Sequence, residues 1–164
     1  MPQKTIREIP ANPLLQDTRK RKKNLRVAAY CRVSTEEEEQ QSSFEIQVEY
    51  YTNKINSHDN WKLVKIFADD GISGVHVKKR TQFLEMIELC KKKKIDLILT
   101  KSISRFARNT LECIQYVRML KSLDIPVIFE KEGINTADMT SEMILTCLSS
   151  FAQAESESIS LNVA

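Results

Sequence analysis

The chain has 164 residues, of which 41% are hydrophobic and 29% charged, with only 3 glycines and 4 prolines. This composition fits one globular domain with its own hydrophobic core, and it excludes collagen-like, mucin-like and wholly disordered chains. The formal net charge of +3 is concentrated in residues 1–24, which hold seven of the 25 Lys and Arg but two of the 22 Asp and Glu.

The first 24 residues contain three prolines and the basic run RKRKK at 19–23, and they are predicted to form a flexible basic tail. No apolar stretch of a signal peptide follows them. Further along the chain, no apolar run approaches the ~20 residues that a helix needs to cross a bilayer. We therefore expect a cytoplasmic protein with no membrane partner.

From residue 25 onward, short apolar runs alternate with segments of helical periodicity, which is typical of βαβ units. Strands separated by single helices must be largely parallel, with right-handed crossovers that place helices on both faces. The predicted fold class is therefore α/β, with a mostly parallel four- to five-stranded sheet in residues 25–140 and the start of a long C-terminal helix at 141–164. The individual strands are predicted at 25–31, 61–68, 95–100 and 125–129.

Helix signals separate these strands. Ser42 and Glu45 form a capping box for the first helix, and Asn109 with Glu112 forms the N-cap pattern of the third. The second helix ends in the lysines at 91–94, whose charge suits a helix C-terminus.

Basic and hydroxyl side chains follow the predicted strands at the carboxyl edge of the sheet, where ligands of such folds bind. Arg32 and Ser34 follow the first strand, and Arg105 and Arg108 follow the third. Guanidinium groups match the geometry of phosphate oxygens, and a serine hydroxyl can attack phosphorus. This combination predicts cleavage of a phosphate diester; alternatively, the arginines form surface ion pairs with the acids at 36–39.

Two other functions stay open from the residues alone. Asp69, Asp70 and Asp96, together with Glu130, could hold Mg²⁺ in a metal-dependent nuclease. The chain could also be a non-catalytic α/β interaction module. Its four cysteines lack the spacing of a zinc site, and no glycine-rich nucleotide loop is present, so neither a zinc ion nor a nucleotide bound by such a loop is expected.

Four sequence blocks carry a resemblance to the serine recombinases, the resolvase and invertase family. YCRVST at 30–35 resembles the family's nucleophile motif, and KSISRFARN at 101–109 resembles its paired-arginine block. DGISG at 70–74 is similar to the second block, and AQAE at 152–155 to the head of the long helix. The blocks keep the family's order over about residues 26–160, and they look most like the catalytic domain of large serine integrases and transposases.

The resemblance implies that Ser34 attacks the DNA backbone and becomes joined to a 5′ phosphate, while Arg32, Arg105 and Arg108 activate the scissile phosphate. Neither metal nor ATP would be needed, and there would be no small-molecule substrate. The family positions that support such a site correspond here to Tyr30, Gln47, Asp70, Arg80, Asp96 and Glu155.

The resemblance also implies partners. Members act on DNA as homodimers that assemble into a tetramer, so the protein would be associated with the nucleoid when bound. Their DNA-binding part follows the long helix, and we therefore expect these 164 residues to be a catalytic part with little sequence-selective affinity for DNA.

Overall fold

The computed structural model describes residues 24–33, 37–70 and 80–163. The predicted basic tail, Ser34 and most of the DGISG block lie outside these residues. A few side chains beside the gaps and near the C-terminus, including those of Asp70 and Glu155, are likewise outside the description.

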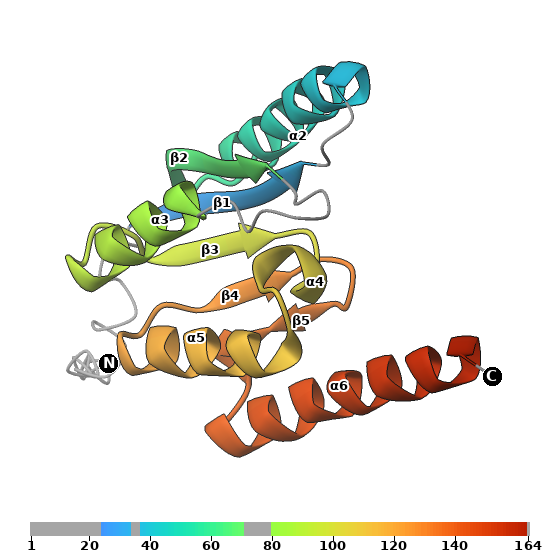
Figure 1. The fold of residues 1–164 in the computed structure, drawn as a ribbon. Coiled ribbons are helices and arrows are strands. Elements are labelled where there is room, and N and C mark those ends of the chain that lie inside the picture. The colour runs from blue at the N-terminus through green and yellow to red at the C-terminus, as the bar shows by residue number, and fades with distance from the viewer. Residues whose placement is uncertain (1–23, 34–36, 71–79, 164) are drawn as a thin grey trace, which may run out of the picture.

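Five strands form one sheet in the order β2-β1-β3-β4-β5 (Figure 1). The first four strands are parallel to their neighbours, and the short β5 pairs antiparallel with β4. The predicted α/β class with a mostly parallel sheet is therefore confirmed. The strands are β1 (Leu25–Val33), β2 (Trp61–Asp70), β3 (Leu97–Thr100), β4 (Val127–Phe129) and β5 (Ile134–Asn135).

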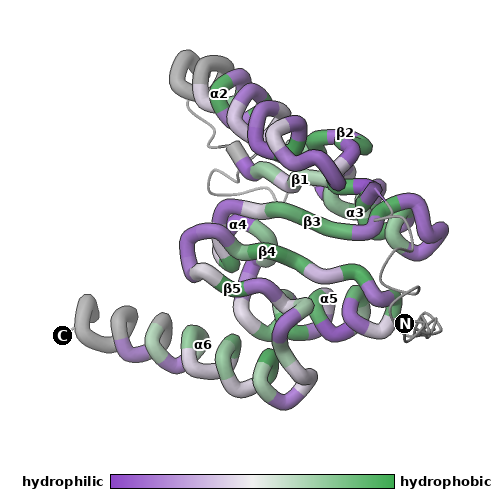
Figure 2. The backbone as a smooth tube through the Cα atoms, turned by 180° about the vertical axis from the view of Figure 1, so that it is seen from behind, coloured by the Kyte–Doolittle hydropathy of each residue, from purple (hydrophilic) through white to green (hydrophobic). Residues whose placement is uncertain are grey.

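Helices cover both faces of the sheet, as predicted, but unequally (Figures 1 and 2). One face packs against α2 alone, and the other packs against α3, α4 and α5, with the start of α6 against α5. The helices are α2 (Glu37–Asn56), α3 (Thr81–Lys91), α4 (Ile103–Phe106), α5 (Thr110–Ser122) and α6 (Ser141–Val163), with a 3-10 turn, η2 (Thr136–Asp138), before α6.

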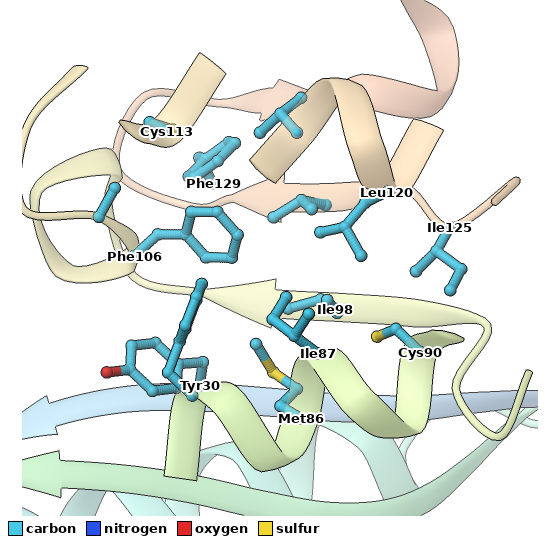
Figure 3. Packing of buried hydrophobic residues seen from close by; sticks show 14 of the residues in the cluster. Tyr30, Met86, Ile87, Cys90, Ile98, Phe106, Cys113, Leu120, Ile125 and Phe129 are labelled. Atoms are coloured by element: carbon cyan, nitrogen blue, oxygen red, sulfur yellow. The ribbon is translucent and has the colours of Figure 1, made fainter. Parts of the chain in front are cut away.

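Alternate residues of β1 enter different halves of the core, because side chains along a strand point to opposite faces. Val27 and Ala29 pack with Tyr51 and other residues under α2, whereas Tyr30 joins the larger cluster on the opposite face. In that larger cluster, aromatic rings meet edge to face, an arrangement favoured by their quadrupoles. The pairs include Tyr30–Phe83 at 5.1 Å, Phe83–Phe106 at 5.2 Å and Phe106–Phe129 at 5.5 Å (Figure 3).

One local prediction is corrected by the structure. Helix α2 begins at Glu37, so Ser42 lies inside the helix and is not its cap. Glutamates are good helix formers and are favourable near a helix N-terminus, which explains why the acidic run at 37–39 extends the helix. The segment after Gly133, which lies outside the four predicted strands, contains β5 and η2. The N-cap of α5 is confirmed, because Asn109 accepts a hydrogen bond from the Glu112 amide at 2.8 Å.

Helix α6 is attached to the body only near its start. Ile144 and Leu148 are 1% and 2% exposed, whereas Phe151, one turn further, is 38% exposed. Beyond this point the helix runs away from the sheet (Figure 1). Among the described helices, α6 included, none combines the length and apolarity that a membrane crossing requires.

The aromatic cluster should make neighbouring residues of α3 very unequal in their contribution to stability. Phe83 is 1% exposed and Leu84 is 50% exposed. Phe83→Ala should lower the free energy of unfolding by about 3–5 kcal/mol, because a large cavity remains. Leu84→Ala should cost less than about 1 kcal/mol. Urea denaturation measures both, and equal losses would contradict this packing.

The cysteines should differ in reactivity. Burial raises the pKa of Cys31, Cys90 and Cys113 to about 12, so these thiols stay protonated at pH 8 and react slowly. Cys147 is only partly buried. Ellman's reagent at pH 8 should modify one thiol quickly, the fast phase should vanish in Cys147→Ser, and urea should expose the other three. A second fast thiol in the folded chain would contradict the described burial.

Candidate active site

Two arginines meet at the carboxyl edge of the sheet. Arg32 lies next to the end of β1, and Arg105 lies on α4, directly after β3. The Nη1 atom of Arg105 donates a hydrogen bond to the carbonyl oxygen of Arg32 at 3.2 Å. The structure thus brings together two of the three arginines that the sequence placed at this edge.

The surroundings of Arg32 favour an anionic ligand. Its pKa is lowered, first by burial and next by the positive charge of Arg105. Its Nε atom is buried and has no hydrogen-bond partner among the described residues. A buried donor on a cation is costly when it is unpaired, and an oxyanion would satisfy it while offsetting the repulsion between the two guanidinium groups.

The segment that follows β3 holds Arg105 and Arg108 differently. Ser102 caps α4, because its Oγ atom accepts a hydrogen bond from the Arg105 amide at 3.3 Å. The helix ends at Phe106, and Ala107 is extended, with φ −132° and ψ 159°. Arg105 and Arg108 therefore do not share one helical turn, contrary to the simplest interpretation of their spacing. The side chain of Arg108 is exposed.

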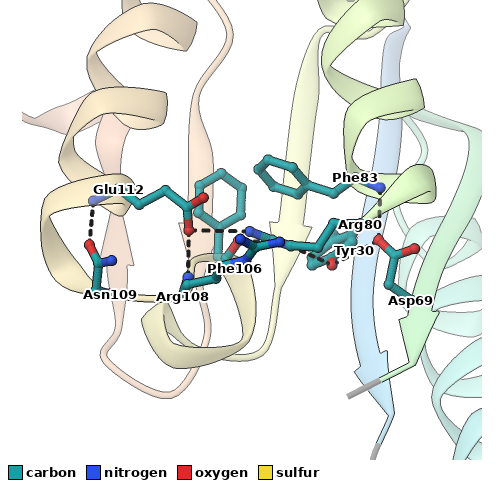
Figure 4. A network of polar contacts seen from close by, with 8 residues as sticks. All are labelled: Tyr30, Asp69, Arg80, Phe83, Phe106, Arg108, Asn109 and Glu112. Atoms are coloured by element: carbon teal, nitrogen blue, oxygen red, sulfur yellow. Dashed lines mark hydrogen bonds and ion pairs between the residues drawn. The ribbon is translucent and has the colours of Figure 1, made fainter. Parts of the chain in front are cut away.

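Arg80 occupies the centre of a polar network behind this edge (Figure 4). The residue is 7% exposed, and its guanidinium lies 3.8 Å from the centre of the Phe83 ring. It donates to the Tyr30 hydroxyl at 3.2 Å and to the carbonyl oxygen of Phe106, and it pairs with Glu112 at 3.5 Å. With its donors engaged in this way, Arg80 supports the site from inside the protein.

Asp69 anchors the other end of the same network. Its carboxylate accepts hydrogen bonds from the amides of Gln82 at 3.0 Å and Phe83 at 2.9 Å, so it caps the N-terminus of α3 from the end of β2. It also accepts the Tyr30 hydroxyl proton at 3.0 Å. Burial raises the pKa of Tyr30 to about 12, against the opposing effect of Arg80. Tyr30 therefore acts as a neutral hydrogen-bonding link.

Among the described residues, the predicted magnesium ligands are not brought together. Asp96 precedes β3 and pairs with Arg26 at 2.9 Å, at the start of β1. Arg32 follows Arg26 by six positions along β1, which is about 20 Å along a strand. Asp96 is thus at the opposite edge of the sheet from Arg32 and Arg105, and its role as a supporting residue of the site stays a prediction.

The remaining acids do not change this conclusion. Glu130 binds Tyr50 at 2.7 Å and Lys54 at 3.3 Å, which joins β4 to α2. Within the part of the chain that the structure describes, no three potential ligands cluster around a common point.

Three further predicted residues are placed only in part. Gln47 is on α2, where its Nε2 atom lies 3.3 Å from the Oγ atom of Ser43. Asp70 ends β2 and Glu155 lies on α6, but both side chains are outside the described set. Ser34 itself follows β1 immediately, also outside it.

Sequence reasoning missed the actual roles of Asp69 and Glu112. Asp69 lies twelve positions before the first residue of the helix that it caps, so no local pattern identifies it as a cap. Glu112 was interpreted as part of an N-cap pattern, and the structure adds that its carboxylate accepts the Arg108 amide proton at 2.6 Å. The spacing of four residues between Arg108 and Glu112 was the available signal.

Comparisons with known proteins agree on one family. Residues 27–164 match the family described as Resolvase, N terminal domain. A resolvase/recombinase of Pseudomonas putida is 32% identical over 131 residues, which are 80% of this chain and 65% of that protein. The Tn3 transposon resolvase of Escherichia coli is 30% identical over 80% of this chain and 64% of its own length. The chain thus spans less than two thirds of these relatives.

Solved structures show the same fold. A resolvase family site-specific recombinase from Streptococcus pneumoniae has a TM-score of 0.64 and 26% identity, covering 85% of this chain and 93% of that one. The N-terminal catalytic domain of TP901-1 integrase has a TM-score of 0.52 and 24% identity, covering 80% and 97%. The second likeness is one of fold alone.

The capping role of Asp69 predicts a clear effect on stability. Asp69→Ala removes the acceptor of two amides and of the Tyr30 hydroxyl, and it should lower the free energy of unfolding by about 2–3 kcal/mol. Asp59→Ala, at an exposed carboxylate, is the matched control and should change little. Urea denaturation followed by circular dichroism distinguishes them. Equal, small losses would show that α3 does not depend on this cap.

Proposed function

Because the chain belongs to the resolvase family of serine recombinases, we propose that it is the catalytic domain of an enzyme that breaks and rejoins DNA through Ser34. The observation that carries this proposal is the contact between Arg32 and Arg105, with a buried guanidinium nitrogen of Arg32 that has no acceptor among the described residues. Ser34 follows the end of β1 in sequence, two residues after Arg32. A scissile phosphate bound by these arginines would therefore lie near the part of the chain that carries the serine.

The proposed reaction is a transesterification. The Oγ atom of Ser34 forms a bond to phosphorus while the bond from phosphorus to the 3′ oxygen of the DNA breaks. The serine gives up its proton, the released 3′ oxygen gains one, and the 5′ phosphate stays on Ser34. Attack by a 3′ hydroxyl on this phosphoserine reverses the step. One phosphodiester replaces another each time, so no ATP is consumed.

Positive charge for this reaction would come from arginine. Negative charge is redistributed over the phosphate oxygens in the transition state, and fixed cations that are already in place stabilise it most effectively. Arg32 and Arg105 supply two such charges, and Arg108, exposed on the next segment, supplies the third. In this mechanism guanidinium groups do the work that metal ions perform in many other phosphoryl transfers, so no metal cofactor is required.

The partners follow from the same proposal. The substrate is DNA, and the active assembly is a homodimer that pairs into a tetramer. The apolar side of α6 supports the dimer, because Leu145 and Phe151 remain 43% and 38% exposed where the helix leaves the body. Recognition of a particular DNA site is expected to need sequence beyond the 164 residues, in keeping with the share of the relatives that the chain spans.

The test is covalent trapping. The complete gene product that contains this chain is incubated with a library of duplex DNA in EDTA, and DNA that is linked to protein is recovered and sequenced. We expect linkage with the wild type, none with Ser34→Ala, and strongly reduced linkage with Arg105→Ala. Ser122→Ala, at an exposed serine at the end of α5, is the matched control and should react normally.

Three outcomes would reject the proposal. Linkage that survives in Ser34→Ala would remove the serine from the chemistry. Cleavage that stops in EDTA and returns with Mg²⁺ would indicate a metal-dependent nuclease. DNA exchange by the intact protein that does not respond to Arg105→Ala would indicate a non-catalytic module.

A further inference from the structure

Resting on the proposed function, we propose that Glu112 is a positioning residue that fixes the backbone of Arg108 and thereby aims its guanidinium at the scissile phosphate. Glu112 lies in the first turn of α5, and Arg108 lies in the extended link between α4 and α5. Neither residue belongs to a strand, so no sheet hydrogen bond holds this link.

The contacts of Glu112 converge on that link. Its Oε2 atom accepts the Arg108 amide proton at 2.6 Å, which is a charge-assisted bond. Its own amide donates to the Oδ1 atom of Asn109 at 2.8 Å. Glu112 thus restrains the chain directly beside Arg108, both through its carboxylate and through its backbone amide.

The same carboxylate is tied to the protein interior. Its Oε2 atom lies 3.5 Å from the Nη1 atom of Arg80, whose side chain is only 8% exposed, while that of Glu112 is 24% exposed. Arg80 in turn binds the Phe106 carbonyl, at the end of α4. Glu112 and Arg80 therefore hold the two ends of the link between α4 and α5, one at each side of Ala107.

This arrangement explains how an exposed side chain can act with accuracy. The Arg108 guanidinium has many rotamers, and it is exposed. A fixed main chain restricts where those rotamers can reach, and displacement of a catalytic group by about 1 Å can slow a reaction on the order of 10²-fold. Binding of DNA depends on many phosphate contacts and should be much less sensitive.

The test compares three substitutions in the complete gene product, using DNA fragments that the wild type cleaves. Glu112→Ala removes the acceptor, and the rate of covalent linkage at saturating DNA should fall on the order of 10²-fold. The DNA concentration for half-maximal linkage should stay unchanged. Glu112→Gln keeps an acceptor oxygen for the Arg108 amide and should restore most of the rate.

Glu112→Asp keeps the negative charge near Arg80 but draws the carboxylate back by one methylene, so it should slow linkage. This variant provides the test if Glu112→Ala does not fold. Hydrogen exchange of the Arg108 amide gives an independent readout, and protection should be lost in Ala and Asp and kept in Gln. Glu88→Ala is the matched control, because Glu88 is an exposed carboxylate that pairs with Lys91 at 3.1 Å.

The outcomes separate this inference from the proposed function. Wild-type linkage by folded Glu112→Ala or Glu112→Asp overturns the positioning role, and so does a loss in Glu112→Gln as large as that in Glu112→Ala. In either case linkage that still depends on Ser34 leaves the proposed function standing. Linkage that is independent of Ser34 rejects the proposed function, whatever the Glu112 variants do.

Discussion

The burial of one charged group, the Arg80 guanidinium, constrains the carboxyl edge of the sheet. A cation in a protein interior is stable only if its donors are satisfied. Here the Tyr30 hydroxyl, the Phe106 carbonyl and the Glu112 carboxylate do so, while the Phe83 ring covers one face. These partners come from β1, α4, α5 and α3, so satisfying one side chain fixes the mutual positions of four elements. The segments that carry Arg105 and Arg108 are held in place as a consequence.

Arg32 and Arg105, the two cations in front of this network, differ from Arg80 in how well they are stabilised. Arg32 and Arg105 repel each other, and the Nε atom of Arg32 is buried without an acceptor among the described residues. The folded domain therefore holds two groups in an arrangement that is unfavourable until an anion arrives. The network around Arg80 can sustain this unfavourable arrangement, and a bound anion would relieve it. The buried Arg80 thus stabilises the fold, while the less buried Arg32 and Arg105 form a site that would favour an anion.

The sequence was sufficient for the sheet, because apolar runs such as 95–100 are unmistakable and single helices between them force parallel pairing. It was insufficient where the signal is not local. Asp69 caps a helix that begins twelve positions further along the chain, and only the tertiary fold brings the two together. Asp96 lies at the opposite end of the sheet from Arg32, which a resemblance of motifs alone does not indicate. The spacing of Arg105 and Arg108 would fit one helical turn, but α4 stops after Phe106.

The two borders of the sheet also bear on how this domain behaves in a crowded solution. An unpaired strand edge invites another chain to add to it. On one border β5 is only two residues long and runs against its neighbour, which leaves little template. On the other, β2 is ten residues long, but it displays the exposed lysines Lys62 and Lys65, whose charge discourages a further strand. The domain can therefore offer its carboxyl edge to a polyanion without inviting aggregation through its sides.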